Sequence, residues 1–203
     1  MTKIKNFRLT LRPREVARLL KNQHGVQITP ELEASIEHTL SDVKRFLQPV
    51  ALYTTVTQSV AEKTAPLPLP VGGVALSVVA ATIGPQLEEE RHSVVEKDAL
   101  QGALLSAIQQ EAVTQATQFA LRLIQEQAKG EECEMSAPAP LAEGSLLVPL
   151  AALLGLQRIG VVLDPAAPHM PPYARLIWTA WTPVRKSGSK RSDSSSRPEK
   201  AAV

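Results

Sequence analysis

The feature that most constrains this fold is a helical pattern that begins near Asp98 and runs to about Lys129. Asp98, with Gln101 three residues later, is typical of a capping box at a helix N-terminus. An apolar stripe follows at spacings of three and four residues, and it comprises Leu100, Leu104, Ile108, Ala112, Ala116, Phe119 and Leu123, widened by Leu105, Val113 and Ala120. The pattern therefore predicts one long helix that is largely buried at the centre of the domain.

A buried strand is expected shortly before this helix. Residues 74–83 form a near-continuous apolar run, and a Gly84-Pro85 corner separates them from an acidic helical segment with glutamates at residues 88–90. Glycine allows a tight exit from the strand, proline suits the first turn of a helix, and negative charge is favourable near a helix N-terminus. The corner is therefore predicted to be structural, and its own acids argue against an anion site there.

Shorter patterns predict the other elements. Alternating or β-branched runs indicate strands at residues 4–11, 50–60, 158–163 and 174–181. Helical patterns cover residues 13–23, 30–47 and 146–157, with Gly25 ending the first and Thr29 as the N-cap of the second. Residues 130–145 are rich in turn formers and are expected to form a loop. The mixture of segments predicts an α+β fold.

The charge distribution divides the chain into two parts. Residues 183–203 hold six basic and two acidic residues among many serines, a net charge of +4, so this segment is predicted to be a disordered basic tail. Residues 1–182 are predicted to form one α+β domain. Because this body has no basic patch interleaved with aromatic residues, no specific nucleic-acid binding is expected.

The remaining sequence features argue against several classes of function. The chain has no dinucleotide-binding glycine pattern, no P-loop and no nucleophile elbow, so no catalytic residue is assigned. Glu88 and His92 share a helix face, but a solvated pair is a better interpretation than a metal site. The single cysteine, Cys133, and the absence of a signal-peptide pattern predict a cytoplasmic protein. Prolines interrupt the uncharged residues 65–84, which favours a strand over a membrane span.

Three segments together resemble a known family. Residues 82–113, TIGPQLEEE followed by KDALQGALLSAIQQEAV, are similar to T-L-G-x-x-L-E-E and D-x-L-x-A-L-L-L-D-A-x-G-S-x-A-V-E of the activation domain of cobalamin-dependent methionine synthase. Residues 159–180 resemble that family's late I-G-V-x-L…M-x-P segment, and residues 28–56 resemble its early helix and strand. Their order and spacing agree with the family over most of residues 4–182.

The resemblance implies a twisted antiparallel sheet packed with helices. It also implies a protein that binds S-adenosylmethionine and supplies a methyl group to reduced cobalamin on a methyltransferase. The family's ligand turn, R-x-x-P-G-Y, corresponds here to a region in which only Gly144 matches and Ser145 replaces the tyrosine, while Glu143 adds a negative charge. Ser106 stands in place of the family's aspartate, and Gln109 and Gln110 replace its Gly-Ser pair. The resemblance thus predicts a retained scaffold with an eroded ligand site.

Three hypotheses remain open from the sequence. The first is a docking partner that assists reactivation of a cobalamin-binding methyltransferase, with weak S-adenosylmethionine binding and with cobalamin contacted only through the partner. The second is a component of the methionine synthase system that binds S-adenosylmethionine and still supplies a methyl group. The third is an interaction scaffold unrelated to cobalamin. Any residual ligand pocket is predicted to include Gly144, Ser145, Met170, Pro172 and Tyr173.

Overall fold

A computed structural model of the chain describes residues 1–57, 59, 73–141 and 146–184. The predicted start of the basic tail at residue 183 is wrong, because Pro183 ends the last strand, Ala174–Pro183, and the Val184 amide donates to the Glu132 carbonyl at 2.9 Å. Residues 185–203, together with Gly144 and Ser145, lie outside the described residues. The strands are β1 Thr2–Lys5, β2 Val50–Thr57, β3 Ala75–Thr82, β4 Cys133–Met135, β5 Ala139–Pro140 and β6 Ala174–Pro183. The helices are α1 Pro13–His24, α2 Pro30–Asp42, α4 Gln86–Val95, α5 Ala99–Gly130 and α6 Leu147–Leu154, with single 3-10 turns at η1 Val43–Phe46 and η2 Leu156–Ile159.

The strands form one antiparallel sheet in the order β1-β2-β3-β6-β4, with β5 also paired to β6. The central strand pairings, β2 with β3 and β3 with β6, run without interruption along the whole of β3. At one end of β3, Thr82 lies opposite Val50 of β2 and Ala174 of β6. Every residue of β3 is buried because helices cover both of its faces. The predicted α+β fold with an antiparallel sheet is confirmed.

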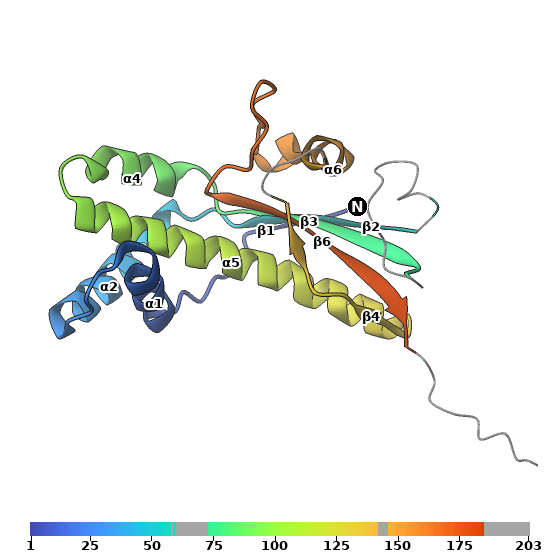
Figure 1. Ribbon diagram of the computed structural model, residues 1–203, viewed down its shortest axis with the longest axis horizontal. Coiled ribbons are helices and arrows are strands. Elements are labelled where there is room, and N and C mark those ends of the chain that lie inside the picture. Colours follow the sequence, from blue (N-terminus) through green and yellow to red (C-terminus); the bar gives the residue numbers. More distant parts are fainter. Residues whose placement is uncertain (58, 60–72, 142–145, 185–203) are drawn as a thin grey trace, which may run out of the picture.

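Helix α5 crosses one face of the sheet along the length of the molecule (Figure 1). Its N-terminus is capped as the sequence predicts, because Asp98 Oδ1 accepts a hydrogen bond of 2.9 Å from the Gln101 amide. Its C-terminal half packs Ala120, Ile124 and Ala128 against the sheet, beside the fully buried Trp181 of β6. The prediction of one long, largely buried helix is confirmed.

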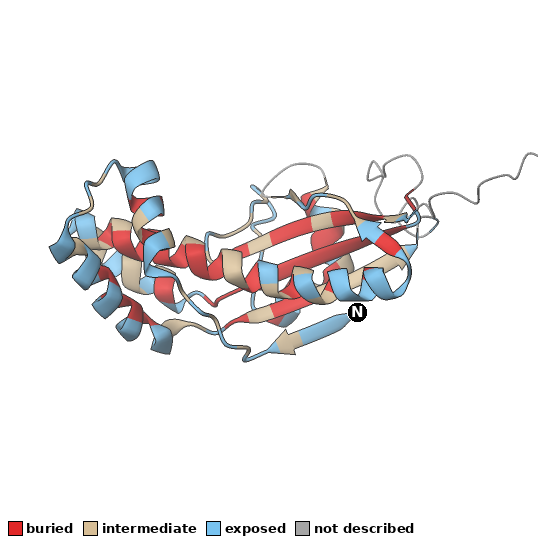
Figure 2. Ribbon diagram, turned by 90° about the horizontal axis from the view of Figure 1, so that it is seen from below, coloured by how far each residue is buried: buried red, intermediate tan, exposed pale blue. Residues whose placement is uncertain are grey.

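The N-terminal half of α5 extends beyond the sheet and forms a separate, mostly helical core (Figure 2). Helices α1 and α2 pack Leu20 and Ile36 onto it, and α4 contributes Leu87 from another direction. At Gly102 the end of α4 lies close to α5, because a Cβ there would lie 2.8 Å from Val95 Cγ2. The helices therefore hold α4 at a fixed position beside α5.

The opposite face of the sheet is covered by α6 and η2. Leu147, Leu150 and Leu154 of α6 pack on Leu52 of β2 and Leu176 of β6. Gly155 ends α6 with a φ of 62°, a left-handed conformation that glycine adopts without strain. The predicted helix in this segment is confirmed.

The corner between β3 and α4 has the expected local chemistry. Gly84 has a φ of 81°, and its amide donates a hydrogen bond of 3.1 Å to Thr82 Oγ1. The Thr82 hydroxyl in turn donates to the Tyr173 carbonyl at 3.1 Å, which ties the corner to the start of β6. Pro85 is the residue before α4, and Glu88 and Glu89 lie in its first turn.

One predicted strand is only partly right and another is wrong. Residues 4–11 alternate imperfectly, and β1 includes Ile4 and Lys5 but ends there, where Asn6 turns with a φ of 56°. Beyond that turn, Phe7 stacks on Phe119 of α5 at a ring separation of 4.2 Å. Residues 158–163 likewise form no strand, because Gly160 bends the chain with a φ of 74° and Ile159 packs under α6. Residues 7–11 and 158–163 therefore pack apolar side chains against the cores without joining a strand.

Smaller differences concern element limits. The pattern predicts a helix through Leu47, but α2 ends at Asp42 and continues only as the 3-10 turn η1. Leu100, placed on the buried stripe, is 47% exposed because it lies in the first turn of α5. The expected loop at residues 130–145 contains β4 and β5, whose short strands exist only because β6 pairs with them. No helix within the described ranges is long and apolar enough to cross a membrane.

Candidate functional site

A cleft of about 700 Å³ lies where α4, α5 and the start of β6 meet. The chain at residues 170–172 and the segment around Leu141 complete its walls. Hereafter it is called the α4–α5–β6 cleft, and it is lined by Glu88, Arg91, Ser106, Gln109, Gln110, Val113, Pro140, Leu141, Met170, Pro171, Pro172, Ala174, Arg175 and Leu176. Its lining combines apolar surface with both signs of charge, the composition of many small-molecule sites.

One wall of the cleft carries an ion pair on α4. Arg91 Nη2 and Nε donate to the two carboxylate oxygens of Glu88 at 2.6 and 2.9 Å. His92 Nε2 lies 2.9 Å from Glu88 Oε1 on the same helix. The hydrogen bonds from Arg91 lower the pKa of Glu88, and this effect outweighs partial burial, which by itself would raise that pKa. Glu88 and His92 are thus in contact on α4. No group of three potential metal ligands occurs in the part of the chain that the structure describes.

Arg175 stands on the opposite wall, near the start of β6. Strand alternation places it on the α5-facing side with Ile177 and Trp181. Its guanidinium Nη1 donates a long hydrogen bond of 3.3 Å to the hydroxyl of Thr114, and that hydroxyl donates to the Gln110 carbonyl at 2.7 Å. Burial of the guanidinium lowers the pKa of Arg175 because the charged form loses hydration.

Gln109 lies between these walls and is only 2% exposed. Neither its amide nitrogen nor its amide oxygen has a hydrogen-bond partner within the described residues. The amide is near enough to Glu88 to help lower the pKa of that carboxyl, but the two groups do not make a well-formed hydrogen bond. Because buried polar groups are nearly always paired, an unpaired amide in a cleft indicates a place for a ligand or water.

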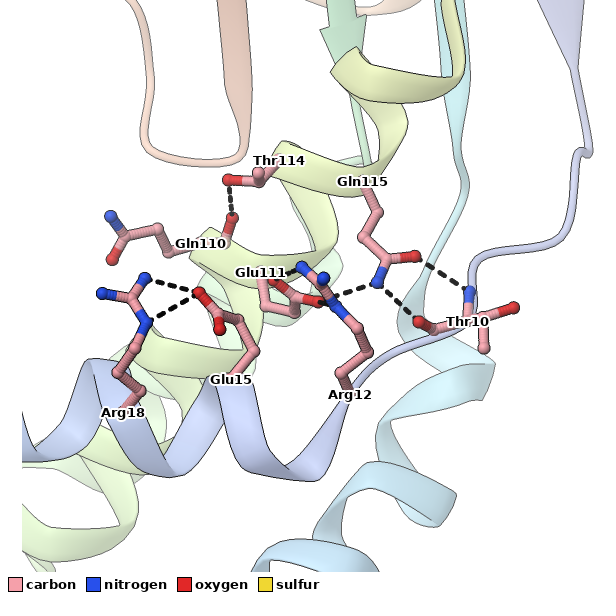
Figure 3. Close-up of polar contacts among 8 residues, drawn as sticks. All are labelled: Thr10, Arg12, Glu15, Arg18, Gln110, Glu111, Thr114 and Gln115. Atoms are coloured by element: carbon pink, nitrogen blue, oxygen red, sulfur yellow. Dashed lines mark hydrogen bonds and ion pairs between the residues drawn. The ribbon is translucent and has the colours of Figure 1, made fainter. Parts of the chain in front are cut away.

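Two residues away, Glu111 is also buried, at 1% side-chain exposure, but it is fully paired (Figure 3). Arg12 Nε donates to its Oε1 at 2.8 Å, and Gln115 Nε2 donates to the same oxygen at 2.7 Å. Gln115 also accepts from the Thr10 amide at 3.1 Å and donates to the Thr10 carbonyl. This group, here called the Glu111 cluster, holds residues 10–12 against α5 through hydrogen bonds. Because its buried carboxylate is already paired, the cluster gives no indication of a ligand.

The sequence-predicted site residues fall into three groups. Met170 and Pro172 line the cleft, and their role in ligand binding stays a prediction. Tyr173 lies beside them but does not line it, since its ring packs between the two cores and its carbonyl accepts from the Ile83 amide at 3.0 Å. Gly144 and Ser145 lie outside the described residues, so their place in the site stays a prediction.

The sequence does not predict Arg175 or the pair of Glu88 and Arg91 as site residues. It marks Gln109 only as a departure from the family pattern. The available signals are an arginine at an inward position of the apolar strand 174–181 and a glutamine on the apolar side of the central helix. Both signals can be recognised only when the buried face of each element is known. That face is visible in the assembled structure and not in the sequence.

A second groove, of about 660 Å³, lies between residues 7–13 and α2. Leu9, Leu11 and Leu40 contribute to its walls. The unpaired amide lies in the α4–α5–β6 cleft and not in this groove. The cleft is therefore the stronger candidate for a ligand site.

Neither a protein-family model nor a curated protein sequence matches this chain. Among solved structures, the fold resembles one described as the crystal structure of the MetH reactivation domain bound to AdoHcy. The TM-score is 0.56 at 8% sequence identity, and the match covers 88% of this chain and 77% of the other. The fold is thus similar to that of the MetH reactivation domain, and at this identity the likeness concerns the fold alone.

Proposed function

We propose that this protein is a cytoplasmic accessory protein that docks on a cobalamin-binding methyltransferase and assists its reactivation. The supporting observation is the similarity of the fold to that of the MetH reactivation domain, which extends over 88% of the chain. Three sequence segments in the family's order support the same proposal. In this proposal cobalamin is contacted only through the partner.

Binding of S-adenosylmethionine by this protein is proposed to be weak or absent. The arginine and tyrosine expected in the ligand turn are missing from the sequence, and Ser145 stands in place of the tyrosine. A charge-assisted contact is worth about 1.5–3 kcal/mol, so its loss weakens binding by roughly tenfold to a hundredfold. The proposed role therefore depends on docking more than on methyl donation.

A second candidate is a component that binds S-adenosylmethionine and still supplies a methyl group. One observation favours it: the α4–α5–β6 cleft holds a guanidinium, Arg175, that comes from a different element than the expected ligand turn. An arginine there can replace the missing one only if the ligand lies against β6. Titration calorimetry of the full chain with S-adenosylmethionine separates the candidates, because a micromolar or tighter Kd promotes the second.

The docking proposal is tested with the purified full chain and a cobalamin-loaded methyltransferase from the same organism. Binding is followed by interferometry, and reactivation by the absorbance change as inactive cob(II)alamin is converted in the presence of a reductant and S-adenosylmethionine. We expect saturable complex formation and a faster return of the active cofactor when this protein is present. A bovine serum albumin control sets the background. Absence of a complex together with an unchanged reactivation rate would refute the proposal.

A further inference from the structure

The arginines of this protein are paired in different ways. Arg12, Arg18 and Arg91 each contact a glutamate within 2.8 Å. Arg175 makes no ion pair with a carboxylate among the described residues, where its guanidinium makes only the long hydrogen bond to Thr114. A half-buried guanidinium without a counter-ion is unfavourable, so an anion that reaches it gains a well-oriented, partly desolvated partner.

Gln109 supplies a second observation that is independent of charge. Its side chain is only 2% exposed, lines the same cleft and has both polar atoms unpaired within the described part of the chain. Arg175 contacts α5 at Thr114, between one and two helical turns beyond Gln109. The amide N–H groups can donate to a ligand oxygen, and the amide oxygen can accept from a ligand donor.

The remaining lining limits the kind of anion. Val113, Leu141 and Met170 give the cleft apolar surface for the body of a ligand. Glu88 and Arg91 line the cleft as well, but they neutralise each other through two hydrogen bonds, so Arg175 leaves a net charge of one positive unit, which suits a singly charged anion. A carboxylate carries one negative charge and matches the planar guanidinium with two parallel hydrogen bonds.

We propose that Arg175 and Gln109 form an anion subsite that binds the carboxylate of a small, partly apolar molecule. Arg175 holds the carboxylate through its guanidinium, Gln109 donates an amide hydrogen to it, and the apolar wall covers the rest of the ligand. The subsite goes beyond the docking role and does not depend on a methyltransferase partner.

The test uses the full-length protein and three probes: hexanoate, its uncharged analogue hexanamide, and inorganic phosphate. Binding is followed by the NMR shifts of side-chain amides, with the Gln109 signals assigned by their loss in Gln109→Leu. Hexanoate is expected to shift these signals with a dissociation constant in the millimolar range, since a single ion pair and a short chain supply only about 4 kcal/mol. Hexanamide and phosphate are each expected to bind at least ten times more weakly.

Arg175→Gln is expected to weaken hexanoate binding by roughly tenfold to a hundredfold. Arg122→Gln is the matched control, because Arg122 lies on α5 outside the cleft and, among the described residues, makes only a 3.4 Å hydrogen bond to the Gln118 carbonyl. If Arg175→Gln does not fold, the ratio of hexanoate to hexanamide affinity in the unaltered protein still decides the question. The proposal is overturned by no hexanoate binding at about 10 mM, by equal binding of hexanamide, by tighter binding of phosphate, or by unchanged affinity in a folded Arg175→Gln protein.

Discussion

Helix α5 carries two buried polar side chains only two residues apart, Gln109 and Glu111, and their surroundings are opposite. Glu111 faces the chain at residues 10–12, where Arg12 and Gln115 satisfy its carboxylate. Gln109 faces the α4–α5–β6 cleft, where its amide has no partner in the described part of the chain. Burial is nearly equal, at 1% exposure for Glu111 and 2% for Gln109, so burial does not distinguish them.

What distinguishes them is the pairing of the polar atoms. A fully paired buried group contributes to stability and specifies how neighbouring segments pack, whereas an unpaired one costs free energy in the unliganded protein. The Glu111 cluster therefore belongs to the fold, and Gln109 belongs to a site that is completed by something bound. Mutations on the two sides of α5 should separate stability from binding.

The largest effect is expected for Glu111→Ala. The substitution removes the carboxylate that joins Arg12 and Gln115 and leaves space in a buried region, so we expect a loss of about 2–3 kcal/mol in the free energy of unfolding. Chemical denaturation measures this loss. Glu15→Ala is the control, since it removes only the surface pair with Arg18 and should leave the free energy nearly unchanged. Equal effects of the two substitutions would contradict a structural role for the cluster.

Gly102→Ala, on the cleft side of α5, should lower the free energy of unfolding of the protein by about 1–2 kcal/mol. Alanine favours a helix by up to about 1 kcal/mol, but the new Cβ would lie 2.8 Å from Val95 Cγ2 and 3.1 Å from Val95 Cα, so α4 must shift. Gly130→Ala in the same helix is the matched control, because nothing beyond the local helix backbone lies within 4 Å of the position its Cβ would take. Thermal unfolding should show a lower Tm only for Gly102→Ala. A higher Tm would mean that α4 moves freely against α5.

A smaller, pH-dependent effect is expected at Glu88. Hydrogen bonds from Arg91 lower its pKa in the folded state, so its stabilising contribution is present above its unfolded pKa of about 4.3 and is lost as the pH falls through the folded value. The difference in unfolding free energy between the unaltered protein and Glu88→Gln should be below about 1 kcal/mol at pH 7, because desolvation of the largely buried carboxylate offsets part of the gain from its hydrogen bonds to Arg91. Denaturation between pH 7 and pH 3 should show that difference shrinking. A difference that grows on acidification would contradict the pairing.

The sequence predicts those parts of the fold that depend on local chemistry. Asp98 and Thr29 cap their helices as expected, and the uninterrupted apolar run identifies β3. It fails where the outcome depends on distant pairing. β4 and β5 are too short to be recognised without β6, and residues 158–163 have strand composition but no neighbouring edge to pair with.

The candidate site is predictable only in part. The family resemblance points to Met170 and Pro172, and both residues line the cleft, while their role in ligand binding stays a prediction. Arg175 is missed because an arginine in an apolar strand usually indicates an exposed position or a strand end. Its importance follows from the absence of a carboxylate partner in the described residues, which only the assembled α5–β6 contact reveals.

The most direct test of the contrast between the two sides of α5 is the thermal stability of two matched substitutions, Gln109→Leu and Gln115→Leu. Removing the unpaired Gln109 amide should raise Tm, because a buried polar group without partners costs about 1–3 kcal/mol. Removing Gln115 should lower Tm, since it breaks the hydrogen bonds to Glu111 and Thr10. A lower Tm for Gln109→Leu, equal to that of Gln115→Leu, would show that Gln109 is paired in the folded protein and would contradict its assignment to a ligand site.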